Sequence, residues 1–428
     1  MPAQLRELKA PVCFAAVKTE HAESSRIEES IRKFLSIGEA LKVGFRNLGS
    51  FTDADELVDA VIRHGCEGLI LLVSSGGTEP IIVRALENLR IHTLLVSFEA
   101  NNSLPAMLEA HAYLKLKGRL WLHSVYLDLA RISESREALA DALKPLFAVI
   151  DVKTSRIGVI GEPGPWLVYS KVPPAVLKNK FGVDLVNIPL HRLLDAMEGV
   201  EVPPNEVEML RGVANPKISD ERLERILTIY YGLKSIVEGY NLTAVSMDCF
   251  NANRLLGESP CYAMSRLAGE GVDAECEGDL PGLLSVMLAN RLSYNPAMLG
   301  NLSAIRETYI TLAHCMAPLS LASSYMLENS LEPTIGTSLA ARLPAGRQVT
   351  LLKVDLHTGR LVMFTGRIVE SGFLTPRHCR SQVVIKTGAD LTRLLEEPVG
   401  SHLVLTPGNI IGELRTVARL LGLTPVIL

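Results

Sequence analysis

A short acidic run lies in one of the least polar parts of the sequence. Residues 274–280 contain three carboxylates, Glu275, Glu277 and Asp279, and apolar segments flank them on both sides. Carboxylates are seldom buried unless they are paired with a cation or bind a metal ion. The run is therefore either a strained turn or a functional site, and the sequence leaves both interpretations open at this point.

Two histidines could complete such a site. His314 ends the apolar stretch 309–313, and His402 begins the apolar stretch 402–405. Both lie at the ends of predicted strands, although each alone is as compatible with a hydrogen-bonded core histidine as with a metal ligand. A carboxylate with two imidazoles would suit Mn²⁺ or a similar divalent ion.

The elements that must position these residues fall into three parts. Strand–helix alternation with continuous apolar strands predicts parallel sheets covered on both faces. A first Rossmann-like α/β domain is expected over 1–150, with a mostly helical stretch at 105–143, and a second over 151–310 that carries Glu277. The tail, 311–428, has alternating strand patterns and predicts a β-rich, antiparallel, barrel-like domain that carries His314 and His402. The fold class is thus α/β with a β-rich C-terminal domain.

Composition excludes several classes of protein. Of the 428 residues 48% are apolar and 21% are charged, and the net charge of −4 offers no global basic field for nucleic acid or anionic lipid. The first residues lack the apolar core of a signal peptide, and no window of about 18 residues is apolar enough to span a membrane. The seven cysteines are odd in number and scattered. They indicate reduced thiols in a cytoplasmic protein.

The site residues resemble a known family. The motifs that carry the resemblance lie within about residues 240–428, and they are the run 275–279, the helix 280–292, Asn301, the pair His314-Cys315 and the stretch 401–408. This half of the chain looks like the C-terminal half of the L-fucose/L-arabinose isomerase superfamily, and the shorter fucose isomerase-like members are the closer match.

The resemblance implies an aldose–ketose isomerase of carbohydrate metabolism that acts on an open-chain sugar. Such enzymes use a divalent metal, typically Mn²⁺, and transfer a proton through a cis-enediol. Glu277 matches the family's first catalytic and metal-binding carboxylate, and His402 matches a C-terminal ligand. His314 falls where arabinose isomerases place a further ligand. Family members are homo-oligomers, trimers or hexamers, so the resemblance also implies that assembly.

One position departs from the family pattern. Asn301 stands where the true isomerases carry the second catalytic Asp or Glu. An amide cannot accept a proton at neutral pH and is a weaker metal ligand than a carboxylate. Asp248, after a predicted apolar strand, could face the same cleft. Asp279 is expected to cap the following helix, and Glu275 is left without an assigned role.

Two loop residues are candidates for binding the sugar. Thr78 follows two glycines at the end of a predicted strand, where it could cap a helix or line a ligand loop. Trp166 lies in a Gly-Pro turn at a strand end, where a sugar-stacking ring and a packing aromatic are equally compatible with the sequence. Because of Asn301, two alternatives to the isomerase stay open: a divergent lyase or epimerase, and a non-catalytic sugar-binding protein.

Overall fold

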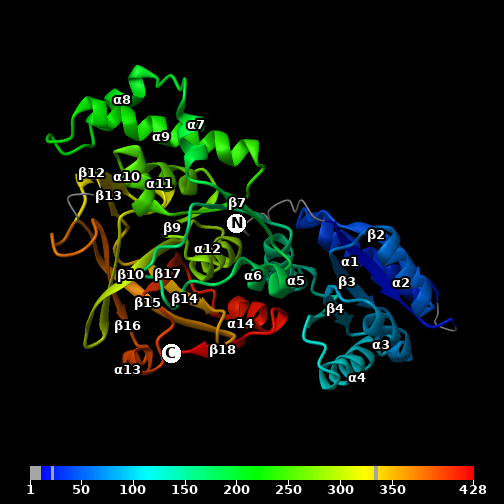
Figure 1. Cartoon of the computed structure of the whole chain (residues 1–428). Helices are drawn as coiled ribbons and strands as arrows, with labels where there is room; N and C mark the ends of the chain where they lie inside the picture. The colour runs from blue at the N-terminus through cyan, green and yellow to red at the C-terminus, as the bar shows by residue number, and fades with distance from the viewer. Residues whose placement is uncertain (1–10, 21–23, 332–335) are drawn as a thin grey trace. The chain divides into compact units, whose positions relative to one another are not determined.

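The computed structural model describes residues 11–20, 24–331 and 336–428 (Figure 1). Two compact units make up the chain, Met1–Asp151 with Glu413–Leu423, and Val152–Gly412 with Thr424–Leu428. The division into three domains that the sequence suggests stays a prediction. In the described part, no helix combines the length and apolar character needed to cross a membrane.

The first unit is built on a five-stranded parallel sheet with the order β2-β1-β3-β4-β5. Apolar cores lie on both of its faces, and β1, β3 and β4 are buried along their whole length. The sheet is therefore doubly covered, as continuous apolar strands favour. Its elements are β1 (Val12–Val17), α1 (Ser24–Ala40), β2 (Arg46–Phe51), α2 (Ala54–Arg63), β3 (Gly68–Val73), α3 (Glu79–Asn88), β4 (His92–Phe98), α4 (Ser103–Leu116), β5 (Leu122–Leu127), α5 (Ile132–Lys153) and the returning α14 (Ile411–Leu420).

The stretch 105–143 is mostly helical, as expected, because α4 and α5 cover most of it. The edge strand β5 between them was not expected, since its burial alternates and it lacks a continuous apolar run. Two other expectations for this unit are wrong. Thr78 stands at the N-cap position of α3 but does not cap the helix through its side chain, since its hydroxyl donates to the carbonyl of Ser75 at 2.7 Å. The expectation of reduced thiols is wrong for Cys13 and Cys66, which form a disulfide with Cα atoms 5.8 Å apart. The two cysteines are 53 residues apart in the sequence, and they come together because β1 pairs with β3.

The second unit begins with a four-stranded parallel sheet of order β7-β6-β8-β9. Helices cover it, and one apolar cluster fills the space between them. Its elements are β6 (Arg156–Ile160), α6 (Pro174–Phe181), β7 (Asp184–Ile188), α7 (His191–Met197), α8 (Pro204–Arg211), α9 (Asp220–Gly239), β8 (Ala244–Met247), α10 (Cys249–Leu256), α11 (Cys261–Gly269), β9 (Asp273–Cys276) and α12 (Leu280–Ser293).

A closed antiparallel barrel completes the second unit. Six strands follow the order β14-β17-β10-β11-β16-β15, and β14 pairs with β15 to close the ring. Closure removes the exposed edges that an open antiparallel sheet would leave. The barrel strands are β10 (Met298–Arg306), β11 (Tyr309–His314), β14 (Gln348–Asp355), β15 (Arg360–Gly372), β16 (Ser381–Thr387) and β17 (His402–Pro407). Two parallel-sheet α/β parts and a β-barrel confirm the expected fold class.

Smaller elements lie beside the barrel, and the sequence did not predict three of them, which are two short strands and one 3-10 turn. β12 (Ser324–Asn329) and β13 (Thr337–Arg342) form a separate hairpin, and β18 (Thr424–Ile427) adds to β15 in parallel. The strand expected at 334–340 begins outside the described residues, and β13 covers its later part. The short pieces η1 (Leu319–Leu321) and α13 (Leu391–Glu396) make up the rest.

Helix α12 joins the parallel sheet to the barrel. It contacts β8 and β9 on one side and β14, β17 and β10 on the other, and almost all of its residues are buried. A helix buried on every side must be apolar all round, which explains its leucine-rich sequence. Gly282 in its first turn has no room for a side chain, because an added Cβ would lie 2.5 Å from Leu299. The N-terminus of α12 therefore lies in a fixed place beside the barrel.

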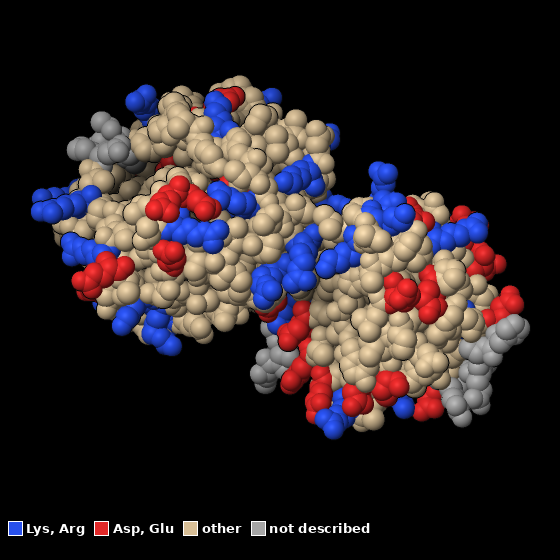
Figure 2. Space-filling view, turned by 90° about the horizontal axis from the view of Figure 1, so that it is seen from below, with Lys and Arg blue, Asp and Glu red and all other residues tan. Residues whose placement is uncertain are grey.

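The face of the molecule drawn in Figure 2 carries basic and acidic side chains interspersed with one another. This mixture accords with the small net charge of −4. A surface that holds nucleic acid is expected to gather cations instead.

Candidate active site

Glu277 occupies a strained turn between β9 and α12. Its φ is 72°, and the following Gly278 has a φ of 74°. A left-handed conformation costs a residue with a Cβ roughly 1–2 kcal/mol, and such outliers are concentrated at functional sites. Only glycine fits at 278, because a Cβ there would lie 2.6 Å from Cα of Pro163. The turn ends the strand and exposes the Glu277 side chain to a cavity.

The loop that follows β6 holds Glu277 from the other side. The amide of Gly164 donates to the carbonyl of Glu277 at 2.9 Å, and Nε1 of Trp166 donates to its Oε2 at 2.6 Å. The indole packs edge-on against Phe250, with ring centroids 4.2 Å apart. Trp166 therefore orients the carboxylate, although 45% of its surface stays exposed.

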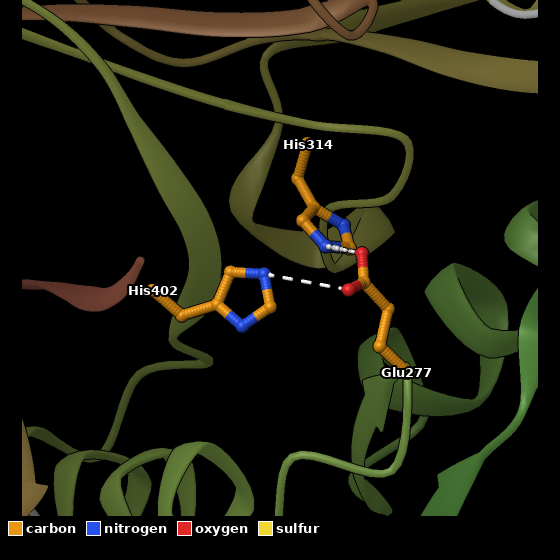
Figure 3. Close-up of side chains that lie close together, drawn as sticks. All are labelled: Glu277, His314 and His402. Atoms are coloured by element: carbon orange, nitrogen blue, oxygen red, sulfur yellow. Dashed lines mark ion pairs between the residues drawn. The ribbon is translucent and has the colours of Figure 1, made fainter. Parts of the chain in front are cut away.

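Two buried imidazoles face the same carboxylate. His314 ends β11 and His402 begins β17, with exposed fractions of 2% and 0%. Their Nε2 atoms lie 3.6 Å and 3.9 Å from the two carboxylate oxygens of Glu277. Figure 3 shows both rings pointing toward that carboxylate. One ligand atom from each of the three residues lies within 4.8 Å of the others.

Three ring nitrogens of these two histidines have no hydrogen-bond partner at ordinary distance among the described residues. This is true of both ring nitrogens of His314 and of Nε2 of His402. A buried polar atom without a partner costs about 1–3 kcal/mol. A divalent cation would satisfy one ring nitrogen of each histidine, because imidazole and carboxylate together are suitable ligands for such ions. The buried Glu/His/His group could therefore hold a metal ion.

A buried chain of charges orients His402. Nδ1 of His402 lies 2.9 Å from Oδ2 of Asp279, and the same oxygen accepts from Nζ of Lys353 at 2.5 Å. All three side chains are fully buried. A carboxylate that accepts Nδ1–H leaves the lone pair on Nε2, which is the tautomer that a metal ligand requires. Asp279 also caps α12 by accepting from the amide of Gly282 at 2.8 Å, as expected.

The pKa values of the three carboxyl groups in the acidic run are shifted differently, because their surroundings differ. Burial would raise the pKa of Glu277, but the nearby imidazoles of His314 and His402 outweigh it and lower that pKa to about 2. Burial also opposes ionisation of Asp279, whose pKa Lys353 and His402 hold well below its usual range. Burial, and next the charge of Asp279, raise the pKa of Glu275 well above its usual range, while Ser246 donates to it. These surroundings favour the protonated form of the Glu275 carboxyl group.

Glu277 and His314 line a cavity of about 490 Å³. Asn301 lies on its wall between the two histidine strands, because β10 places it opposite His402 on β17 and opposite Ala313 on β11. The described lining contains no Lys or Arg, and it includes five free cysteines. The lining residues are Trp166, Cys249, Phe250, Ser259, Pro260, Cys261, Cys276, Glu277, Asn301, His314, Cys315, Ser330, Leu331 and Cys379.

The structure thus brings together five of the predicted site residues: Glu277, Asn301, His314, His402 and Trp166. Two others are not among the described residues that line this cavity. Thr78 belongs to the first unit. Asp248 caps α10, and its two carboxylate oxygens accept from the amide and the side chain of Asn251 at 3.1 Å and 2.6 Å.

Sequence reasoning missed Lys353. A signal was present, because a lysine interrupts the apolar stretch 349–354 of a predicted strand, and a buried cation needs a carboxylate partner. The partner could not be identified, since Asp279 lies 74 residues away in the sequence.

An α/β scaffold that presents a buried Glu/His/His group beside a cavity is typical of a metal-dependent enzyme of small molecules. Comparisons with known proteins specify the family. The sulfoquinovose isomerase of Alkalicoccus urumqiensis is 30% identical over 324 residues, which cover 68% of this chain and 69% of that protein. The sulfoquinovose isomerase of Priestia aryabhattai is 27% identical over 294 residues, 63% of each chain. The chain therefore belongs to the sulfoquinovose isomerase family, whose members are sugar isomerases.

Two further comparisons add nothing to this assignment. A scan against protein-family models finds no match. A solved solute-binding protein of an ABC transporter from Clostridium phytofermentas covers 79% of this chain and 95% of its own, at 10% identity and a TM-score of 0.17. A score that low supports no inference about fold or function.

Proposed function

We propose that this protein is a metal-assisted aldose–ketose isomerase of the fucose isomerase-like type, acting on an open-chain sugar. The observation that carries the proposal is the cluster of Glu277, His314 and His402, which is buried, partly without hydrogen-bond partners and next to a sugar-sized cavity. Membership of a family of sugar isomerases gives that cluster a reaction.

Glu277, His314 and His402 would hold the metal ion, for which we propose Mn²⁺. When bound, a divalent ion polarises the carbonyl and hydroxyl oxygens of the sugar and stabilises the negative charge of the enediolate. Asp279 and Lys353 keep His402 in the tautomer that presents Nε2 to the site. Trp166 holds Oε2 of Glu277, so the carboxylate keeps one orientation.

Glu277 is also the proposed base. It takes the proton from C2 of the aldose and returns it to C1 on the same face of the cis-enediol, while the hydroxyl proton of O2 passes to O1 and the C2–O bond becomes the carbonyl of the ketose. Because the two carbons are neighbours in a planar intermediate, one carboxylate can reach both. A second carboxylate is therefore not required for the transfer between the carbons.

Asn301 stands at the position where the resemblance to true isomerases would place a second carboxylate. Its amide reaches the cavity from β10, between the strands of the two histidines. We propose that this side chain donates a hydrogen bond to the enediolate oxygen, as neutral amides do at other sites of developing negative charge. Its role would then be to stabilise charge rather than to accept a proton.

The substrate, the assembly and the location of the protein belong to the same proposal. The relatives are named for sulfoquinovose, a hexose that carries a sulfonate. The described cavity lining contains no cation to meet that anionic group. We therefore propose that the substrate is an open-chain hexose. Whether it is neutral or sulfonated is decided by testing both kinds of sugar side by side. We also propose that the protein is cytoplasmic and forms a homo-oligomer, a trimer or hexamer. Trp166, Thr78 and Asp248 are the residues that we propose for sugar binding.

Deuterium exchange tests the proposal. The purified protein is incubated with Mn²⁺ in D₂O and with sulfoquinovose or one of a panel of neutral hexoses and pentoses, and deuterium at C2 and ketose formation are followed by NMR. We expect exchange and ketose with at least one sugar, and neither with Glu277→Gln. Exchange accompanied by an epimer instead of a ketose would indicate an epimerase. No exchange on any sugar would refute the proposed reaction.

A further inference from the structure

Two thiols lie in contact on the wall of the cavity. Sγ of Cys315 is 3.4 Å from Sγ of Cys379, and each side chain is partly exposed. Cys315 directly follows His314 at the end of β11, and Cys379 lies in the turn between β15 and β16. Other cysteines of the lining are more deeply placed, and Cys261 and Cys276 are buried.

We propose that Cys315 and Cys379 are a redox-active pair that forms a disulfide when the cavity admits a hydroperoxide. A disulfide needs its sulfur atoms at about 2.05 Å, so the two atoms must approach by little more than 1 Å from the observed 3.4 Å. Hydrogen peroxide is small enough to enter a cavity of about 490 Å³, which both side chains line.

The reaction balances with one equivalent of peroxide. The sulfur of Cys379 attacks one peroxide oxygen, the O–O bond breaks, and the products are a sulfenic acid and water. The sulfur of Cys315 then attacks the sulfenic sulfur, which forms the S–S bond and releases a second water. The two thiols lose two electrons and two hydrogens in total, and the peroxide is reduced to two waters.

The disulfide would act on the proposed metal ligand. Arg380 anchors the turn that carries Cys379 by donating to the carbonyls of Asn329 and Ser330 at 2.7 Å and 2.8 Å. Gln382 donates to the carbonyl of Cys379 at 3.0 Å. The carbonyl of Cys315 accepts from the amide of Leu339 at 2.9 Å, so this side is held too. The approach of the sulfurs therefore strains both segments, and on the side of Cys315 the strain reaches the neighbouring His314. This consequence rests on the proposed function, whereas the disulfide itself does not.

Peptide mapping and metal binding test the two statements separately. The reduced full chain is treated with hydrogen peroxide, digested under conditions that block free thiols, and examined by mass spectrometry. Mn²⁺ binding is measured by calorimetry before and after the treatment. We expect a peptide pair linked through Cys315 and Cys379, and a Mn²⁺ affinity lowered by at least about tenfold. Dithiothreitol should break the link and restore the Mn²⁺ affinity.

Two variants make the test specific. Cys379→Ser should form no link, and peroxide should leave its Mn²⁺ affinity unchanged. Cys249→Ser is the matched control, because Cys249 lines the same cavity beside Cys276 instead of beside Cys315, and it should form the link as the unchanged protein does.

Three outcomes would contradict the inference. Unlinked Cys315 and Cys379 after oxidation, whether free or over-oxidised, or a link from Cys315 to Cys261, would refute the pair. A link without a change in Mn²⁺ affinity would refute its effect on His314. A reduced protein that does not bind Mn²⁺ would instead refute the proposed function and the coupling, and the mass spectrum would still decide whether the pair exists.

Discussion

Replacing Asp279 by Asn isolates the contact that orients His402. Asn is as good an N-cap as Asp, so the amide of Gly282 keeps an acceptor at the start of α12. With the amide oxygen on that side, the NH₂ group would face Nδ1 of His402 and the ammonium of Lys353. Both of those groups now donate to Oδ2 of Asp279. His402 must then move its proton to Nε2, and the lone pair for the metal is lost.

Two effects of this change have separate magnitudes. Substitution of a group that orients a ligand typically weakens metal binding about 10–100-fold. Leaving a buried charge unpaired costs about 3–5 kcal/mol of stability, and among the described residues Asp279 is the hydrogen-bond partner of Nζ of Lys353. We therefore expect Asp279→Asn to unfold at lower temperature and to bind Mn²⁺ at least tenfold more weakly.

A double variant separates the two effects. Adding Lys353→Met removes the unpaired charge, and replacing a buried ion pair by apolar groups is often neutral or stabilising. The double variant should regain stability while its Mn²⁺ affinity stays low. Asp248→Asn is the control, because Asp248 is also a buried N-cap but contacts Asn251 and neither histidine. The measurements are calorimetry with Mn²⁺ and thermal unfolding. Mn²⁺ affinity of Asp279→Asn within twofold of the unchanged protein would show that Asp279 serves only as a cap.

Three other outcomes follow from particular contacts. At φ 72°, Glu277→Gly should be more stable than Glu277→Ala by about 1 kcal/mol, against the usual preference for Ala, in urea unfolding. Trp166→Phe keeps an aromatic ring that can stack on the sugar but loses the donor to Glu277, so kcat should fall about tenfold or more while KM changes little. A rise in KM without a fall in kcat would show that Trp166 does not act through Glu277. Burial lowers the pKa of His123 from 6.5 to about 4. The unfolded chain therefore binds the extra proton, and stability present above pH 6.5 is lost as the pH falls toward 4. Acidification from pH 7 to 5 should cost about 2 kcal/mol in urea unfolding through this residue, and His123→Gln should lack that part of the slope.

Much of the fold could be predicted because its signals are local. The continuous apolar runs at 12–17 and 68–73 predict two strands, and they coincide with β1 and β3, which are buried on both faces. β5 was missed because an edge strand is half exposed and its sequence alternates weakly. β18 is four residues long, and its place depends on pairing with β15 far earlier in the chain.

The candidate site was predictable in its residues but not in its connections. Glu277, His314 and His402 could be selected because polar residues at the ends of apolar strands are unusual. The contact of Trp166 with Glu277 spans 111 residues, and that of His402 with Asp279 spans 123. No local pattern encodes such pairs. The left-handed backbone of Glu277 was also invisible, since a non-glycine residue carries no sequence signal for it.

Anomalous diffraction tests the central claim most directly. Crystals grown with Mn²⁺ would be measured at the manganese absorption edge, for the unchanged protein and for Glu277→Gln. We expect one strong peak within about 2.5 Å of a carboxylate oxygen of Glu277 and of Nε2 of both His314 and His402, and a much weaker peak in the variant. An empty cluster at millimolar Mn²⁺, or a peak elsewhere that Glu277→Gln does not change, would contradict the assignment of these three residues as the metal site.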